Sequence, residues 1–230
     1  MDILFEDNHI LVVLKPQNVP SQEDATKDKD MLTMCKEYIK EKYNKPGNVY
    51  CGLVHRLDRP TGGIMVFAKT SKAAARLSEQ FKNREADKTY FAVVKGNLKL
   101  KQTKLVNYLI KDEKNNMAKV VPMSTAGAKR AELDYTELES IDDLHLVKIK
   151  LGTGRGHQIR VQFATIGTPV FGDQKYGGEN MEKANLNLFA VELKFKHPTT
   201  QDTMVFRAYP PEDKKAWNKF NLEKYLSIQK

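Results

Sequence analysis

Short apolar runs bounded by polar or turn-forming residues recur along the chain and predict β-strands. The run at residues 10–14, Ile-Leu-Val-Val-Leu, ends at Lys15 and Pro16 and is typical of a buried strand that enters a turn. At residues 144–151, apolar side chains alternate with lysines, which predicts a strand with one buried face. The other predicted strands cover residues 64–68, 90–94, 131–138, 188–195 and 203–207.

Apolar residues at helical spacing predict helices between these strands. The first helix follows Asp28 or Asp30, either of which can cap it, and presents Cys35 and Ile39 on its apolar face. A second helix, capped by Ser71, turns Lys72 and Arg76 outward. Two further helices are predicted at residues 157–166 and 212–226, the last with Trp217, Phe220 and Tyr225 inward.

Many strands with a few interspersed helices favour the α+β class, built on one extended and largely antiparallel sheet. Residues 97–130 are polar and rich in lysine, and apolar strands flank them closely. We therefore expect a loop or a protruding hairpin there, not a linker between domains. The chain is predicted to form a single domain over residues 1–230.

Composition places the chain among soluble globular enzymes. It has 230 residues, 40% hydrophobic and 29% charged, and no apolar run approaches the roughly 20 residues that span a bilayer. The N-terminus has neither the basic region nor the small-residue cleavage site of a secretory signal. Cys35 and Cys51 have no metal-ligand spacing and are expected to be small buried side chains in a reducing, cytoplasmic environment.

Positive charge is concentrated in one part of the chain. The net charge is +9, and residues 69–104 hold ten basic residues against three acidic ones, an excess of seven. Such a stretch is typical of a surface that meets polyanions, and equally of a solvated lysine-rich face. Charge alone leaves both interpretations open.

One candidate chemical segment is His55-Arg56-Leu57-Asp58-Arg59-Pro60-Thr61-Gly62-Gly63. It places the Asp58 carboxylate between two arginines, just before a predicted buried strand. An aspartate beside an arginine is most often a structural ion pair. A turn that leads directly into a rigid strand is also where a scaffold displays a reactive side chain, so both interpretations stay open.

Two further segments combine glycines with polar side chains. Residues 152–160 read Gly-Thr-Gly-Arg-Gly-His-Gln-Ile-Arg and match neither the dinucleotide-binding fingerprint nor a P-loop. The glycines can expose backbone N–H groups to a phosphate, but a loop that simply leads into a helix is the more economical interpretation. Residues 167–178 are rich in turn residues and are expected to form a structured surface loop.

Other signals are weaker or absent. Tyr90, in Lys88-Thr89-Tyr90, starts a predicted strand and by itself indicates core packing. The sequence contains no Gly-x-Ser-x-Gly elbow and no Cys-x-x-Cys pair. His55 and His157 lack partners at ligand spacing, which argues against a metal site.

Taken in order, these segments resemble the RluA-type family of RNA pseudouridine synthases over nearly the whole chain. The likeness begins at residues 6–16 and continues with His55-Arg56-Leu57-Asp58, Lys88-x-Tyr90, Gly154-Arg155-x-His157-Gln158-Ile159-Arg160 and residues 167–177. Any one motif can arise by chance, whereas the ordered set is highly specific. The resemblance implies a pseudouridine synthase catalytic fold, with a long mixed sheet, flanking helices and a central cleft.

The resemblance also implies a reaction and a set of roles. The uracil ring is detached from ribose at N1 and rejoined through C5, with no cofactor and no metal. Asp58 corresponds to the essential carboxylate, Arg160 to the arginine that pairs with it, and Tyr90 to the tyrosine that stacks on the target base. Arg56 corresponds to a residue that fills the gap left by the flipped uridine. Lys15, Arg155 and His157 are expected to contact the RNA backbone or to support the motifs, and Lys72 and Arg76 to contribute to the RNA surface.

Several positions depart from the family pattern. Gly62 stands where Ser is usual, Gly156 where Thr or Ser is usual, and Gln162 where His often occurs. Gln17-Asn18 also replaces the usual continuation of the Lys-Pro turn. None of these positions is Asp58, Tyr90 or Arg160. The chain is also expected to lack the small N-terminal RNA-binding domain of many relatives and to act as a monomer.

The sequence raises three candidate functions. The first is an enzyme that converts specific uridines in structured ribosomal or transfer RNA to pseudouridine. The second is a catalytically silent RNA-binding protein on the same scaffold, in which the joint presence of Asp58, Tyr90 and Arg160 has no purpose. The third is a small-molecule isomerase or glycosidase, for which no second carboxylate is partnered with Asp58 by motif.

Overall fold

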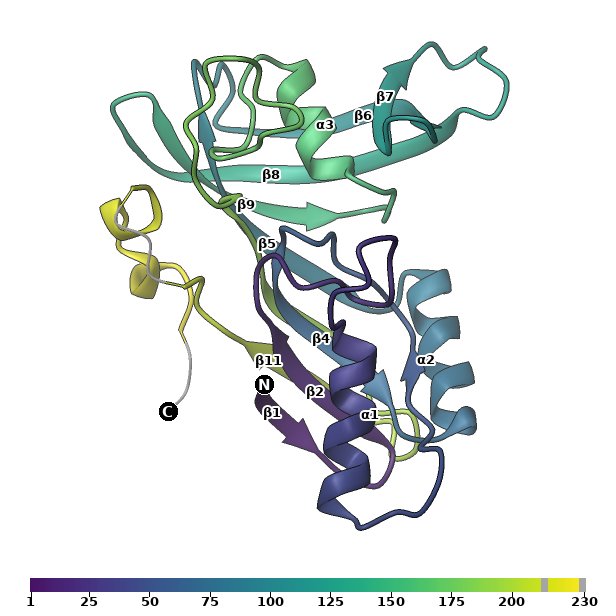
Figure 1. The fold of residues 1–230 in the computed structure, drawn as a ribbon. Helices are drawn as coiled ribbons and strands as arrows, with labels where there is room; N and C mark the ends of the chain where they lie inside the picture. The colour runs from purple at the N-terminus through teal and green to yellow at the C-terminus, as the bar shows by residue number, and fades with distance from the viewer. Residues whose placement is uncertain (212–214, 228–230) are drawn as a thin grey trace. The chain divides into compact units, whose positions relative to one another are not determined.

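A computed structural model describes residues 1–211 and 215–227 of the chain. Eleven strands and three α-helices occur in these residues, which confirms the α+β class (Figure 1). The chain divides into two compact units: residues Met1–Asp87 with Glu192–Ala208 form unit 1, and Lys88–Val191 with Tyr209–Lys230 form unit 2. The single domain over residues 1–230 and its central cleft remain predictions.

Unit 1 contains antiparallel strands around a fully buried centre. Strand β1 (Asp2–Glu6) pairs with β2 (Ile10–Lys15), and β2 pairs with β4 (Gly62–Ala68). Every residue of β4 is buried, as the uninterrupted apolar run predicts. The short β3 (Gly52–Leu53) also pairs with β4, and β11 (Thr203–Arg207) pairs with the C-terminal half of β10 (Leu188–Lys196).

Two helices belong to unit 1, and side chains cap both. Helix α1 (Met31–Lys42) begins after Asp30, whose side chain accepts the Thr33 N–H at 3.0 Å, so the second of the two predicted caps is confirmed. Helix α2 (Ser71–Asn83) begins one residue earlier than expected. Its cap is Thr70, which has an extended backbone and accepts the Ala73 N–H at 3.2 Å, so Ser71 is the first helical residue. Helix α2 packs on β3 and β4 (Figure 1).

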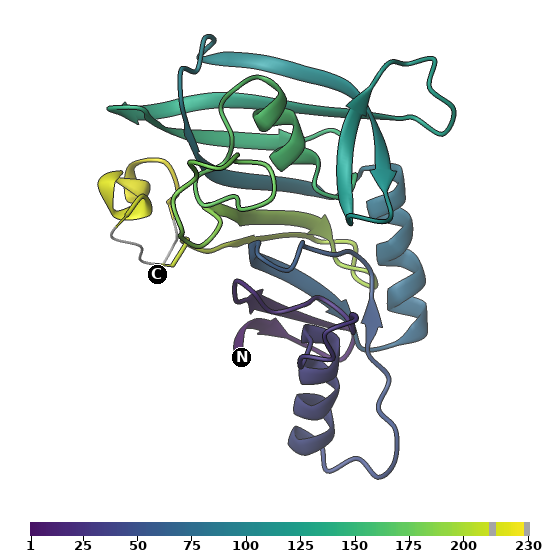
Figure 2. The same cartoon turned by 45° about the horizontal axis from the view of Figure 1, so that its top comes forward.

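Unit 2 contains a five-stranded antiparallel arrangement in the order β5-β9-β8-β6-β7. The strands are β5 (Asp87–Lys95), β6 (Gln102–Asp112), β7 (Met117–Val121), β8 (Lys129–Ile141) and β9 (Leu144–Leu151). Strands β6 and β7 form a hairpin, which confirms that alternative for residues 97–130. Helix α3 (Gln158–Thr165) lies beside β6 and β7 in both views (Figures 1 and 2).

A small apolar cluster joins α3 to these strands. Val161 of the helix packs with Leu109, Ala118 and Ala131 of the strands, and all four side chains are buried. Tyr176, from the loop after α3, packs against the same cluster. The cluster therefore fixes both the helix and that loop on the surface of the strands.

The predicted helix over residues 212–226 is wrong where the structure describes it, and residues 212–214 lie outside the described residues. Two short 3₁₀ turns, Trp217–Lys219 and Leu222–Lys224, occupy the remainder. Trp217 and Phe220 are buried as expected, and their spacing of three residues places them on one side of a 3₁₀ turn. Tyr225 is half-buried and donates its hydroxyl to the Leu138 carbonyl at 3.0 Å.

Candidate active-site halves and supporting loops

The predicted site residues are divided between the two units. Unit 1 holds Lys15, Arg56, Asp58, Lys72 and Arg76, and unit 2 holds Tyr90, Arg155, His157 and Arg160.

Asp58 lies in the loop that leads into β4, and its backbone forms a tight turn. The Thr61 N–H donates to the Asp58 carbonyl at 2.9 Å, and β4 begins at the next residue. Asp58 itself is half-exposed, whereas its neighbour Leu57 is buried. Asp58 is thus carried directly before a fully buried strand, where the scaffold constrains its main chain.

A buried lysine binds the carbonyl groups of the turn that follows Asp58. Lys15, the last residue of β2, is 0% exposed, and its ammonium donates to the carbonyls of Pro16 at 3.0 Å, Arg59 at 3.0 Å and Thr61 at 2.8 Å. Three acceptors match the three N–H groups of an ammonium. Burial lowers the pKa of Lys15 to about 7, the charge of Asp58 raises it, and that of Arg59 lowers it. Lys15 is predicted to contact the RNA backbone or to support a motif; its three contacts lie on the carbonyls of this turn, and its side chain is fully buried.

A serine holds the residue on the other side of Asp58. The Ser21 hydroxyl donates to the Leu57 carbonyl at 2.7 Å and accepts the Leu57 N–H at 3.1 Å. The main chain is therefore anchored both before and after Asp58. Sequence reasoning missed Ser21, because a serine after a proline has no pattern that points to a partner 36 positions away.

The two arginines beside Asp58 have different surroundings. Arg56 is exposed. Arg59 forms ion pairs with Asp24 at 3.4 Å and with Asp28, and it donates to the Thr26 hydroxyl at 2.7 Å. The structural ion pair considered for this segment therefore exists at Arg59, formed with acidic residues upstream.

His55 connects the start of the motif to the scaffold. Its Nε2 accepts the Val66 N–H of β4 at 3.1 Å, and its ring stacks on Phe81 of α2 at a centroid distance of 4.4 Å. Among the described residues, no group of three or more His, Cys, Asp or Glu side chains is placed to hold a metal ion.

The basic stretch at residues 69–104 is not one surface. Lys69 is almost buried and pairs with Glu6 at 2.6 Å, and Lys88 is largely buried, which lowers its pKa. Arg76 is half-buried and donates to the Pro198 carbonyl at 2.6 Å, while Lys72 is exposed as predicted. The stretch also crosses from unit 1 into unit 2. Its charges are therefore divided between structural contacts and solvent.

In unit 2, Tyr90 lies on β5 opposite Ile149 of β9 and is 5% exposed. Helix α3 follows β9 in the chain, after the glycine-rich loop. Gln158 closes that loop: its Oε1 accepts the Thr153 hydroxyl at 2.7 Å and the Arg155 N–H at 3.1 Å, and its Nε2 donates to the Glu132 carbonyl at 2.9 Å. These contacts favour the loop that leads into a helix over a phosphate cradle, because a side chain already binds one of the N–H groups.

Arg160 forms a buried bidentate ion pair. Its Nε and Nη2 donate to the two carboxylate oxygens of Asp173, each at 2.7 Å. Arg160 is 4% exposed and Asp173 is fully buried. Asp173 also accepts the N–H groups of Lys175 at 2.9 Å and Tyr176 at 3.1 Å, so the carboxylate is itself fixed. The pair uses two of the five N–H donors of a guanidinium.

Tyr176 completes this arrangement from the loop after α3. Its ring lies 5.1 Å from Cζ of Arg160, and its hydroxyl accepts the Ala118 N–H at 2.7 Å and contacts Nδ1 of His157 at 2.9 Å. His157 caps α3 in a left-handed conformation with φ of 55°. The predicted surface loop at residues 167–178 is thus a support for Arg160 and His157. The sequence signal for this role was Asp173, but the sequence did not indicate that Arg160 is its partner.

Gly172 is required by this loop. Its φ is +77°, and a Cβ there would lie 2.1 Å from the Asn185 carbonyl oxygen. A side chain would displace the backbone next to Asp173.

Two departures from the family pattern have clear structural settings. Gln162 is fully buried, and its Nε2 donates to Oδ1 of Asn107 at 2.8 Å and to the Leu105 carbonyl at 3.3 Å, which joins α3 to β6. Gly156 is exposed, and a Cβ there would meet nothing within 4 Å. Gln162 is therefore part of the buried contact between α3 and β6, whereas Gly156 has open space beside it.

Comparisons with known proteins agree with this geometry. The sequence profile of the family described as RNA pseudouridylate synthase matches residues 9–165. The chain is 33% identical over 214 residues to the dual-specificity RNA pseudouridine synthase RluA of Haemophilus influenzae, and the match covers 90% of this chain and 92% of the relative. It is 31% identical over 224 residues to ribosomal large subunit pseudouridine synthase D of Zymomonas mobilis, with coverage of 93% and 70%.

Solved structures show the same fold. Human RNA pseudouridylate synthase domain containing 4 superposes with a TM-score of 0.77 at 22% identity, covering 91% of this chain and 88% of the other. Human RNA pseudouridylate synthase domain containing 1 gives a TM-score of 0.72 at 23% identity, with coverage of 91% and 83%.

Proposed function

The chain belongs to the RNA pseudouridylate synthase family, as its motifs predicted, and we propose from this premise that it converts specific uridines in structured ribosomal or transfer RNA to pseudouridine. Membership makes it an isomerase that acts on RNA. The relatives named for a dual specificity and for the large ribosomal subunit support the choice of substrates.

We assign the catalytic carboxylate to Asp58. The observation that carries this assignment is the anchoring of the main chain on both sides of it, by Ser21 at Leu57 and by Lys15 at Arg59 and Thr61. A nucleophile or anion that acts on a flipped uridine must be held in a fixed direction, and a rigid loop provides this without using the side chain itself.

Arg160 is proposed to pair with Asp58 and to keep it ionised. The bidentate contact with Asp173 orients the guanidinium, and a guanidinium close to a carboxylate favours the ionised form of that carboxylate. Tyr90 is proposed to stack on the target uracil and to exchange a proton during the rearrangement. Arg56, which is exposed, is suited to enter the space that the flipped base leaves.

Arg155 and His157 are proposed to contact the RNA backbone near the site. Arg155 is exposed, and its Nε donates to the Arg130 carbonyl at 3.1 Å. This contact uses Nε and not the two terminal nitrogens of the guanidinium. Lys72 is an exposed cation suited to a more distant phosphate.

The test is Asp58→Asn in the full chain, assayed by pseudouridine formation in ribosomal and transfer RNA. We expect no detectable product, because the amide has no charge, while RNA binding and folding persist. Asp24→Asn is the matched control: the same chemical change at an exposed carboxylate that contacts Arg59. An active Asp58→Asn variant would refute the assignment, and equal loss of binding and activity would make Asp58 a structural residue.

A further inference from the structure

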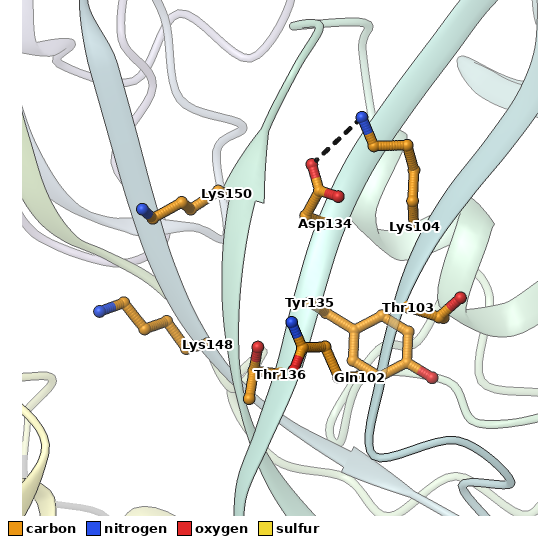
Figure 3. A pocket seen from close by; sticks show the side chains of 8 residues that line it. All are labelled: Gln102, Thr103, Lys104, Asp134, Tyr135, Thr136, Lys148 and Lys150. Atoms are coloured by element: carbon orange, nitrogen blue, oxygen red, sulfur yellow. Dashed lines mark ion pairs between the residues drawn. The ribbon is translucent and has the colours of Figure 1, made fainter.

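A concave pocket of 630 Å³ lies on the strands of unit 2, formed by β6, β8 and β9. Polar and basic side chains line it (Figure 3): Gln102, Thr103, Lys104, Asp134, Tyr135, Thr136, Lys148 and Lys150. None of the residues assigned above to the reaction contributes to this lining.

The strand register defines which face of the strands the pocket occupies. In one row across the three strands, Asp134 lies between Lys104 and Lys150. In the row two residues away, Thr136 lies between Gln102 and Lys148. Tyr90 lies opposite Ile149, between the two lysines of β9. Successive side chains of a strand point to opposite faces, so Lys148 and Lys150 lie on the face of unit 2 that is turned away from Tyr90.

Positive charge in the pocket exceeds negative charge by two. Lys104 pairs with Asp134 at 3.6 Å. The ammonium groups of Lys148 and Lys150 form no hydrogen bond or ion pair within residues 1–211 and 215–227, and Figure 3 shows both side chains extending in the same direction from β9. Two like charges two residues apart on one strand face lie about 7 Å apart and repel each other. An anion between them removes this cost.

We propose that this pocket binds the phosphate backbone of the RNA, at a position distant from the target uridine. The inference rests on the proposed function, which makes RNA the substrate. Lysine binds a phosphate as a flexible point charge, and the amide of Gln102 and the hydroxyl of Thr136 can donate to the same oxygens. The contact reads no base, so it contributes affinity and orientation without sequence preference.

The experiment compares the Lys148→Gln/Lys150→Gln variant with the unchanged chain in RNA binding at several salt concentrations. The plot of log K against log[salt] has a negative slope, and each lost phosphate contact reduces the magnitude of that slope by roughly 0.7–0.9. For two lysines we expect the magnitude to decrease by about 1 to 2. Lys36→Gln/Lys40→Gln on α1 is the matched control. It removes two exposed lysines from one helix face, so the net charge changes by the same amount. An equal decrease in the control would show a general charge effect and overturn the proposal, as would an unchanged slope.

Two further readouts separate this inference from the proposed function. Pseudouridine formation at saturating RNA should keep its kcat in the Lys148→Gln/Lys150→Gln variant while KM rises. In the unchanged chain, bound RNA should protect Lys148 and Lys150 from acylation more than Lys36 and Lys40. If the unchanged chain forms no pseudouridine, the proposed function fails, and the salt slope and the protection still decide the pocket. Absence of protection overturns the pocket even in an active enzyme.

Discussion

The Asp58 loop and the Arg160 side chain are held in place by different means. Around Asp58 the contacts act on the main chain: one buried ammonium binds three carbonyls, and one hydroxyl brackets Leu57. Arg160 is held through its own charge, by a buried carboxylate that two backbone N–H groups fix in turn. The comparison teaches that the loop around Asp58 is held through its main chain, whereas the Arg160 half depends on an intact pair of charges.

Asp173→Ala should cause the largest loss. It removes one partner of a buried bidentate ion pair, which costs about 3–5 kcal/mol in the free energy of unfolding. Urea denaturation measures this cost, and pseudouridine formation should fall with it. Asp143→Ala, at an exposed carboxylate 3.9 Å from Lys95, is the control and should change little. Equal effects of the two changes would mean that the bidentate pair contributes nothing special.

Lys15→Met should have an intermediate effect. It leaves three carbonyls without their donor and lowers the free energy of unfolding by about 2 kcal/mol, with a larger loss of activity because the Asp58 turn loosens. Lys69→Met is the control: this lysine is also nearly buried in unit 1, but its partners are Glu6, Asp7 and Tyr43. Destabilisation without loss of kcat is expected there. Similar kcat values in the two variants would contradict the role given to Lys15.

The pH dependence sharpens this prediction. The pKa of Lys15 is about 7 in the folded protein and near its ordinary value in the unfolded chain, so the unfolded chain binds more protons between these values. The contribution of Lys15 to the free energy of unfolding therefore rises with pH above about 7 and is constant below. The difference between the unchanged chain and Lys15→Met should be greater at pH 9 than at pH 7. A constant difference would place the folded pKa outside this range.

Gly156→Ser should have the smallest effect. The backbone at this position does not need glycine, and an added Cβ meets nothing within 4 Å. The free energy of unfolding should change by less than about 0.5 kcal/mol, and RNA affinity should not fall. Thermal unfolding and RNA titration check both. Marked destabilisation would show that the loop before α3 is as constrained as the loop around Gly172.

Local patterns were sufficient for most of the fold. The alternation of lysines and apolar residues gave strand β9 with its observed limits, and Asp30 capped α1 as expected. The C-terminal helix failed because aromatic residues three apart suit a 3₁₀ turn as well as an α-helix. Short-range spacing does not distinguish these two structures.

The candidate site was predicted only as far as its motifs reach. Asp58, Tyr90 and Arg160 follow from ordered motifs, but their supports depend on distant contacts. The Lys15 ammonium meets carbonyls 44 and 46 positions away, and a lysine at a strand end is ordinarily a surface residue. Asp173 stood in a loop whose turn residues explained it without any partner. Only the folded chain shows that both are buried charges.

The amide of Gln162 has a consequence for acidification. It joins α3 to β6 from a fully buried position through neutral hydrogen bonds. A histidine, frequent at this place in relatives, takes up a proton near neutral pH, and in this environment the new charge would have no water around it. The amide does not titrate, so this link between α3 and β6 stays the same when the surroundings become acidic.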